Sequence, residues 1–264
     1  MRRTIAFLSG LLLGCVLLST TALAGAPEEN RARDAQAVLD KIMRIPEQSV
    51  PQSMLDNAHA IAIIPHMIKA GFMIGGRRGR GLISVRGPNG VWSNPSFVTI
   101  TGGSFGFQAG VQSTDVVLVF TTQHGVESIV HGKFTLGADA SVAAGPVGRA
   151  AEASTDEKLK AEIYSYSRSR GLFAGIALDG AALQIDDHSN EAIYGRDATA
   201  RAIFEGRVNP PPTPIVDFRD RLEEYSASKR YRPHDRDAVA PPPPAQTGET
   251  PPPQPAQTQP LGGH

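Results

Sequence analysis

The chain has a single cysteine, Cys15, among its 264 residues, and it has no excess of charge of either sign. One cysteine cannot form an intrachain disulfide or a site of several thiolates for a metal, so the fold must depend on a packed core. The 26 basic residues are balanced by 26 acidic residues, which excludes the global basic excess of nucleic-acid-binding proteins. Any anion-binding surface must therefore be local.

The N-terminal residues have the pattern of an export signal. Two arginines precede an apolar stretch over residues 5–18, and alanines at 22 and 24 form a small-residue cleavage site. We therefore expect residues 1–24 to be a signal peptide and the mature protein to reach the periplasm or cell envelope. One alternative is that residues 12–15 are a lipobox, in which case Cys15 is lipidated and anchors the chain to a membrane. An uncleaved anchor is a third reading.

Proline marks the end of the folded domain. It dominates residues 209–214 and again residues 240–264, a tail with few apolar side chains to bury, so we expect the tail to be disordered and extended. The chain then divides into a domain over 25–208, a proline hinge with an amphipathic helix over 209–239, and the tail. We interpret the tail as a spacer or tether. The alternative is a ligand for a protein partner that binds proline-rich segments.

Hydrophobic periodicity predicts helices toward both ends of the domain and strands between them. Helices are expected at 33–44, 52–58, 123–130, 198–204 and 215–225, and strands at 60–65, 72–86, 96–101, 115–122, 133–142, 163–170 and 172–185. This order indicates an α+β domain built on a curved, mostly antiparallel, glycine-rich and barrel-like β-sheet with N-terminal and C-terminal helices. Several glycines fall where such strands must bend or pack closely: Gly75, Gly76, Gly79, Gly81, Gly102, Gly103, Gly106 and Gly110.

Three patterns are similar to catalytic or metal sites, but their contexts do not favour such chemistry. The G-x-S-x-G pattern at 102–106 matches a nucleophile elbow, yet the following residues predict a strand where an elbow needs a helix. The two histidines and the glutamate over 124–131 share one helix face, along which they line up without converging on a metal. The acidic pair at 186–187 is interpreted as a turn. We therefore expect no catalytic residue, no metal and no cofactor.

Basic and aromatic residues remain as candidates for a binding surface. The strand at 163–170 alternates, so its tyrosines and arginines share one face, and aromatic rings beside arginines suit a membrane interface. A solvated basic loop with an amphipathic strand is the alternative. The residues that we assign to headgroup binding are Lys69, Arg77, Arg78, Arg80, Arg86, Tyr164, Tyr166, Arg168 and Arg170.

Four stretches resemble the SYLF domain family, over roughly residues 35 to 195. They are KAGF at 69–72, GRG at 79–81, WSNPSFVTITGGSFGFQAG at 92–110 and YSRSRGLFAG at 166–175. The resemblance implies a domain that binds anionic membrane lipids and, in fungal members, actin filaments. It also implies an N-terminal amphipathic helix that docks on the membrane, and it supplies no catalytic residues. The matching helix here has Val38, Leu39, Ile42 and Met43 on its apolar face, with Lys41 and Arg44 near the headgroups.

The sequence therefore predicts non-enzymatic binding of an anionic phospholipid membrane by an exported envelope protein. The alternative is a scaffold that acts through protein partners, either by the actin binding of fungal relatives or by contacts of the proline-rich tail. Nucleic acid is not expected as a partner.

Overall fold

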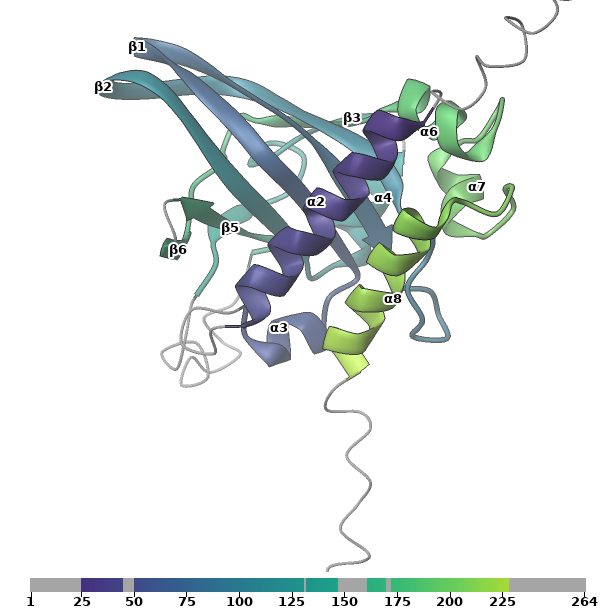
Figure 1. Ribbon diagram of the computed structural model, residues 1–264. Helices are drawn as coiled ribbons and strands as arrows, with labels where there is room; N and C mark the ends of the chain where they lie inside the picture. The colour runs from purple at the N-terminus through teal and green to yellow at the C-terminus, as the bar shows by residue number, and fades with distance from the viewer. Residues whose placement is uncertain (1–24, 45–49, 131, 147–160, 170–171, 228–264) are drawn as a thin grey trace, which may run out of the picture. The chain divides into compact units, whose positions relative to one another are not determined.

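The computed structural model describes residues 25–44, 50–130, 132–146, 161–169 and 172–227 (Figure 1). The predicted signal peptide with Cys15, and the tail over 240–264, lie outside these ranges. In the part of the chain that is described, no helix is long and apolar enough to cross a membrane. The elements in order are α2 (Ala26–Met43), α3 (Gln52–Asp56), β1 (Ala60–Val85), β2 (Ser96–Phe120), α4 (Gln123–Val130), β3 (Lys133–Thr135), β4 (Val142–Ala144), β5 (Ile163–Ser169), β6 (Leu172–Gly175), β7 (Ala182–Ile185), α6 (Asp187–Tyr194), α7 (Ala200–Phe204) and α8 (Thr213–Ala227).

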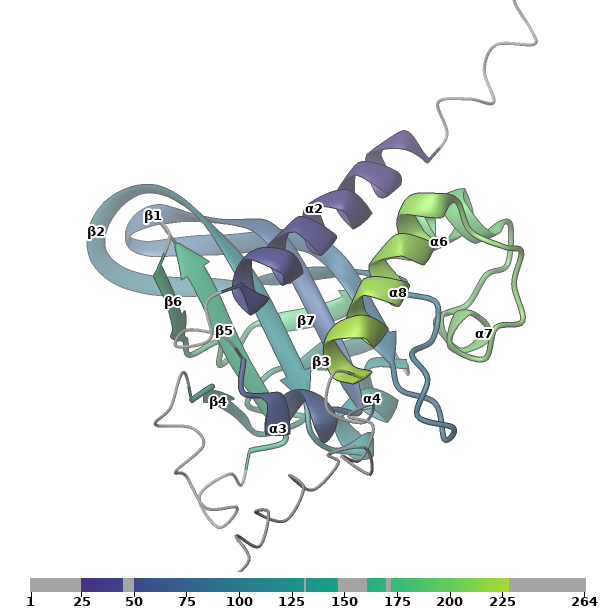
Figure 2. The same ribbon diagram turned by 60° about the horizontal axis from the view of Figure 1, so that its bottom comes forward.

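Strands β1 and β2 form one long antiparallel ribbon. Their pairing runs from Ala60 opposite Phe120 to Ile83 opposite Ser96, and residues 86–95 connect the two strands. The register shifts twice along β1, and such bulges increase the local bend and twist of a strand. Figure 2 shows the ribbon curving over at the end far from this connection. We call this region the bend of the ribbon; it comprises residues 66–76 of β1 and 102–114 of β2.

Glycine allows the two halves of β1 to touch where the ribbon folds back. A Cβ atom added at Gly81 would lie 2.1 Å from the carbonyl oxygen of Ile63, and one at Gly75 would lie 2.3 Å from that of Ala70. A Cβ at Gly79 would collide with side chains of the first half of the strand. The predicted role of glycine in close strand packing is therefore confirmed at these three positions.

The remaining strands add to the second edge of β2. Strand β7 pairs with residues 98–101, and β5 pairs with residues 115–120. Strand β3 continues the sheet from β7, while β4 and β6 pair with β5, and only the pairing of β4 with β5 is parallel. The predicted α+β class with a curved, mostly antiparallel, barrel-like sheet is confirmed.

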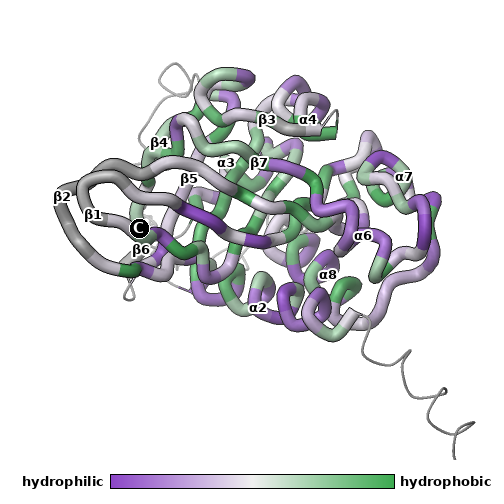
Figure 3. Tube along the Cα trace, turned by 90° about the horizontal axis from the view of Figure 1, so that it is seen from above, coloured by the Kyte–Doolittle hydropathy of each residue, from purple (hydrophilic) through white to green (hydrophobic). Residues whose placement is uncertain are grey.

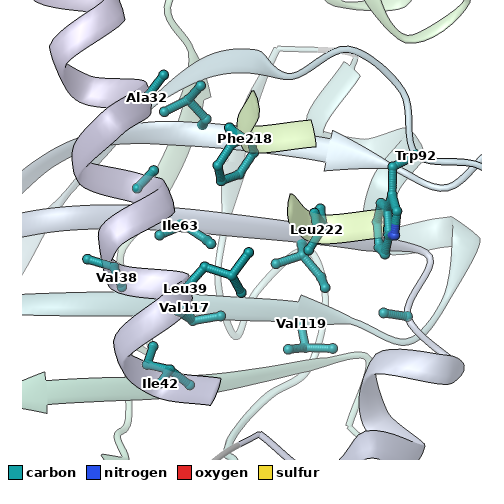
Figure 4. Packing of buried hydrophobic residues seen from close by; sticks show 14 of the residues in the cluster. Ala32, Val38, Leu39, Ile42, Ile63, Trp92, Val117, Val119, Phe218 and Leu222 are labelled. Carbon is teal, nitrogen blue, oxygen red and sulfur yellow. The ribbon is translucent and has the colours of Figure 1, made fainter. Parts of the chain in front are cut away.

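Each face of the ribbon is buried by a different layer. Val117 and Val119 lie on the face that we call outer, which α2 and α8 cover with side chains such as Leu39 (Figure 4). Val116 and Leu118 point to the opposite, inner face, which packs on α4, β3 and β7. The alternation follows from the two-residue period of a strand. Seen from above, hydrophobic residues run along the strands between these two layers (Figure 3).

The connection between β1 and β2 holds α8 in place. Trp92 is buried, and its Nε1 donates a hydrogen bond to Ser226 Oγ at 2.7 Å. Its backbone N–H donates to the carboxylate of Glu223 at 3.1 Å, and the guanidinium of Arg86 lies 4.5 Å from the centre of its ring. Helix α8 is thus part of the main core, so the domain continues past the predicted boundary at residue 208.

The elements differ from the sequence-based expectation in several places. Helix α2 begins at Ala26 instead of residue 33, and the predicted strands at 96–101 and 115–122 are parts of the single strand β2. The predicted strands at 60–65 and 72–86 are one strand, because the bulges bend the chain without ending the ladder. The acidic pair at 186–187 begins helix α6 instead of forming a turn, since Asp186 accepts a hydrogen bond from the Ser189 N–H at 3.3 Å as a helix N-cap. The expected strands at 133–142 and 172–185 are each interrupted.

We predict that Gly81→Ala lowers the free energy of unfolding by about 2 kcal/mol, the cost typical of forcing extra volume into a packed site. Gly103→Ala is the matched control, because a Cβ at Gly103 meets no atom within 4 Å. Urea unfolding of both variants measures the difference. Equal unfolding midpoints would mean that close backbone packing does not shape the ribbon.

Candidate anion-binding groove

A groove lies between the N-terminal half of α2 and the outer face of β1. Its volume is about 580 Å³. The fold-back of β1 places residues 65–68 beside residues 78–80, so both parts of the strand contribute to one wall. The lining residues are Pro27, Asn30, Arg31 and Asp34 of α2 and Pro65, His66, Ile68, Arg78, Gly79 and Arg80 of β1.

Arg78 and Arg80 give the groove its positive charge. They alternate with Gly79 along the strand, so both side chains lie on the outer face, and both are exposed. Within the described residues, neither guanidinium forms a salt bridge with an acid. Burial lowers the pKa of Arg31, and the nearby positive charge of Arg80 acts in the same direction. Arg80 is thus close enough to Arg31 for their charges to interact, while Asp186 and Glu28 act on Arg31 in the opposite direction.

Arg31 forms the floor of the groove and has a structural role. Its Nη1 lies 3.3 Å from Asp186 Oδ2 and 3.3 Å from Ser189 Oγ, and Glu28 lies 3.7 Å from its Nη2. The guanidinium also lies 5.2 Å from the centre of the Phe97 ring. Because two carboxylates already balance its charge, Arg31 ties α2 to α6 and to the sheet and contributes little to the field in the groove.

The rim of the groove combines polar and apolar groups. Asp34 lies 3.9 Å from the ring nitrogen Nδ1 of His66, and both side chains are more than half exposed. Ile68 is 50% exposed on the same wall as the two free arginines. Two guanidinium forks suit the oxygens of a phosphate group, and an apolar rim suits a phosphate that is carried by an apolar molecule.

The other predicted basic residues lie outside the groove lining. Arg77 is on the inner face and donates a hydrogen bond from Nε to a backbone carbonyl of β2 at 2.9 Å. Arg86 donates to the carbonyl oxygens of Leu55 and Asp56, at 2.9 and 2.5 Å, at the end of α3. Lys69 is exposed at the bend of the ribbon. Of the predicted cluster, the structure brings together Arg78 and Arg80 in the groove.

The aromatic residues of β5 belong to the core. Tyr164 and Tyr166 are 3% and 0% exposed in the cluster beneath α2 and α8, and burial raises the pKa of Tyr166. Arg168 lies 4.0 Å from Asp115 and is partly exposed. Arg170 lies outside the described residues. The two tyrosines share one face of β5, as the alternation predicted. Helices α2 and α8 cover this face, so the two rings cannot contact lipid headgroups in this structure.

The apolar face of α2 is packed on the sheet (Figure 4). The residues predicted to insert into a membrane are Val38, Leu39, Ile42 and Met43. The first three are at most 3% exposed, and the fourth is partly buried against the same cluster. Lys41 and Arg44 are exposed. Docking on a membrane through this face would require α2 to leave the sheet and expose the core.

The catalytic-like patterns lie in ordinary elements. Ser104 is within β2, which continues as a strand to Phe120, so no turn into a helix follows the serine. His124 on α4 is exposed, and its Nδ1 lies 2.9 Å from a carboxylate oxygen of Glu162. His131, the third member of that pattern, lies outside the described residues.

The part that α2 and residues 65–68 play in the groove was not predicted from the sequence. The sequence feature nearest to this site is the pair of KAGF and GRG stretches, which both resemble the same family and are separated by a few residues. The fold-back depends on Gly75 between the two stretches and on Gly79 and Gly81 within the second one.

A family model described as "Ysc84: Las17-binding protein actin regulator" matches residues 101–225, from within β2 to α8. LAS seventeen-binding protein 3 of Saccharomyces cerevisiae is 40% identical over 190 residues, which cover 71% of this chain and 40% of that protein. SH3 domain-containing YSC84-like protein 1 of Rattus norvegicus is 33% identical over 204 residues, which cover 75% of this chain and 59% of that protein. The chain thus spans about half the length of the curated relatives it matches.

We predict that Arg86 contributes more to the free energy of unfolding than Arg78 and Arg80 do. Arg86→Gln should lower the free energy of unfolding by about 2 kcal/mol, because it leaves two partly buried carbonyl groups without their charged donor. The double variant Arg78→Gln/Arg80→Gln should change it by less than about 0.5 kcal/mol, as is usual for exposed positions. Urea unfolding tests both. A loss for the double variant as large as that for Arg86→Gln would show that the groove arginines serve the fold.

Proposed function

The chain belongs to the Ysc84, or SYLF, domain family, and from this premise we propose that it binds anionic phospholipid membranes without catalysing a reaction. The observation that carries the proposal is the pair of exposed arginines, Arg78 and Arg80, that share one wall of the groove beside α2. Their guanidinium groups are available to phosphate oxygens, since no acid in the described residues pairs with them. We also propose that residues 1–24 direct export and that the target is a membrane of the cell envelope.

The charge balance of the chain supports a local, reversible attachment. Each arginine or lysine near an anionic surface contributes about 1 kcal/mol of binding free energy. The two groove arginines alone would give weak binding, and the nearby carboxylate of Asp34 reduces it further. The attraction should also weaken with salt, because the Debye length shortens to about 8 Å at physiological ionic strength. We therefore expect the affinity to depend strongly on the fraction of anionic lipid.

A protein-binding role is the second candidate, and the names of the relatives favour it. One relative is named for binding LAS seventeen, and the matching family description names an actin regulator. The relatives are longer than the matched region, so their partners can be bound by parts that this alignment does not include. Cosedimentation of the chain with actin filaments, beside flotation with vesicles, separates the two candidates, because a pure protein binder stays unbound on every lipid.

We predict that Arg78→Gln/Arg80→Gln weakens binding to vesicles containing phosphatidylglycerol by up to about 2 kcal/mol, roughly 1 kcal/mol per arginine. The control is Arg201→Gln/Arg207→Gln, which removes the same charge from exposed positions in and after α7, away from the bend of the ribbon (Figures 1 and 2). Vesicle flotation over a series of salt concentrations measures both. The control should bind like the wild type.

Two results would contradict the proposal. If the wild type stays unbound on anionic vesicles at low salt, it is not an anionic-lipid binder. If the control pair weakens binding as much as the groove pair, only the net charge matters, and the groove is not the site.

A further inference from the structure

The bend of the ribbon exposes apolar side chains. Among the described residues, the large hydrophobic side chains that are exposed are Ile68 at 50%, Val91 at 51% and Val111 at 77%. Val111 pairs with Ala70, which lies two residues beyond Ile68, so these three residues share one face of the ribbon. Val117 follows on the same strand at the same parity and lies on the outer face. The apolar side chains at the bend are therefore on the face that also carries the groove.

Charge is distributed unevenly along the ribbon. Strand β1 has no charged residue between Lys69 and Arg77, and β2 has none from Ser96 through Thr114. Exposed ribbons of soluble proteins usually carry charges that prevent association through their edges. Here Lys69, within the bend, and the groove arginines border the uncharged residues 70–76 and 102–114 instead. An apolar surface bordered by cations is the arrangement of segments that lie at a membrane interface.

The ribbon also projects beyond the sheet at this point (Figures 1 and 2). The second edge of β2 is paired at residues 98–101 and 115–120. Between these ranges, no other described strand pairs with that edge. Backbone groups on an open edge need water or another partner, and leaving them unpaired in hydrocarbon costs several kcal/mol each. The bend can therefore reach the hydrated interfacial region of a bilayer, but it cannot enter the hydrocarbon centre.

We propose that the bend of the ribbon enters the interfacial region of a phospholipid bilayer through exposed apolar side chains that include Val111 and Ile68, while Arg78 and Arg80 hold the phosphate headgroups. The inference rests on the proposed function and deepens it, because it names the part of the domain that contacts the acyl chains. In this arrangement α2 stays packed on the sheet and the core remains closed. An apolar bend without flanking cations would equally suit a protein, but unpaired arginines on the same face favour anionic lipid.

The chain offers a matched pair of exposed valines for the first test. Val111→Asp places a charge on an exposed apolar position of the bend, and Val91→Asp places the same charge on the connection at the other end of the ribbon. Both sites are at least half exposed, so neither change should unfold the domain, and circular dichroism checks this. We expect Val111→Asp to weaken binding to phosphatidylglycerol vesicles at least tenfold, and Val91→Asp to bind like the wild type.

Tryptophan fluorescence tests insertion directly. Val111→Trp and Val91→Trp are mixed with phosphatidylglycerol vesicles whose acyl chains are brominated near the carboxyl end, so that bromine quenches any indole at shallow depth. Trp92 is the only native tryptophan and is 2% exposed, so the wild type supplies the background. We expect quenching for Val111→Trp beyond that background, and none for Val91→Trp.

The outcomes separate this inference from the proposed function. If the wild type floats with anionic vesicles, but Val111→Asp binds equally well and Val111→Trp is not quenched, the bend does not enter lipid and the headgroup proposal stands. If Val111→Asp weakens binding without any quenching of Val111→Trp, the bend contacts another protein chain or the outer headgroups, and insertion is also overturned. If the wild type fails to bind every vesicle, both proposals are wrong.

Discussion

Direct packing of backbone on backbone within β1 is the constraint on which the rest of the structure depends. The strand can fold back because Gly81 places no side chain against the carbonyl of Ile63 and Gly79 leaves room for Ile64. Any larger residue at Gly81 would separate the two halves of the ribbon and open the inner core between them. The same fold-back forms the outer surface on which α2 packs. It also brings together residues 65–68 and 78–80, which form the wall of the groove.

The groove arginines are held by a framework that other residues make rigid. Arg31 anchors the N-terminal half of α2 to α6, and the Trp92 connection anchors α8, so both outer helices are fixed to the sheet. Arg86 caps the carbonyl end of α3 and takes no part in the groove. The paired guanidinium groups of Arg31 and Arg86 thus belong to the scaffold, and those of Arg78 and Arg80, which pair with no described acid, are the ones that we propose for a ligand.

Sequence patterns predicted the local helices and strands well, but they did not predict which elements pack on each face of the sheet. Helix α4 was predicted at its observed bounds, because one apolar stripe of 3.6-residue period is visible in a single segment. The alternation of β5 showed that Tyr164 and Tyr166 share a face, but only tertiary packing decides that α2 and α8 cover it. The role of Arg86 could not be predicted for the same reason, because its hydrogen-bond partners are at the end of α3, about thirty residues earlier in the chain.

The central claim is that the bend of the ribbon and the groove arginines beside it meet the membrane while α2 stays packed on the sheet. Hydrogen–deuterium exchange of the full chain, with and without phosphatidylglycerol vesicles, tests it most directly because backbone amides report on every element at once. We predict slower exchange with vesicles in peptides covering the bend and the groove strand, and unchanged exchange in α2. Faster exchange in α2 with no change at the bend would contradict the claim, since it would mean that the helix leaves the sheet to bind the membrane.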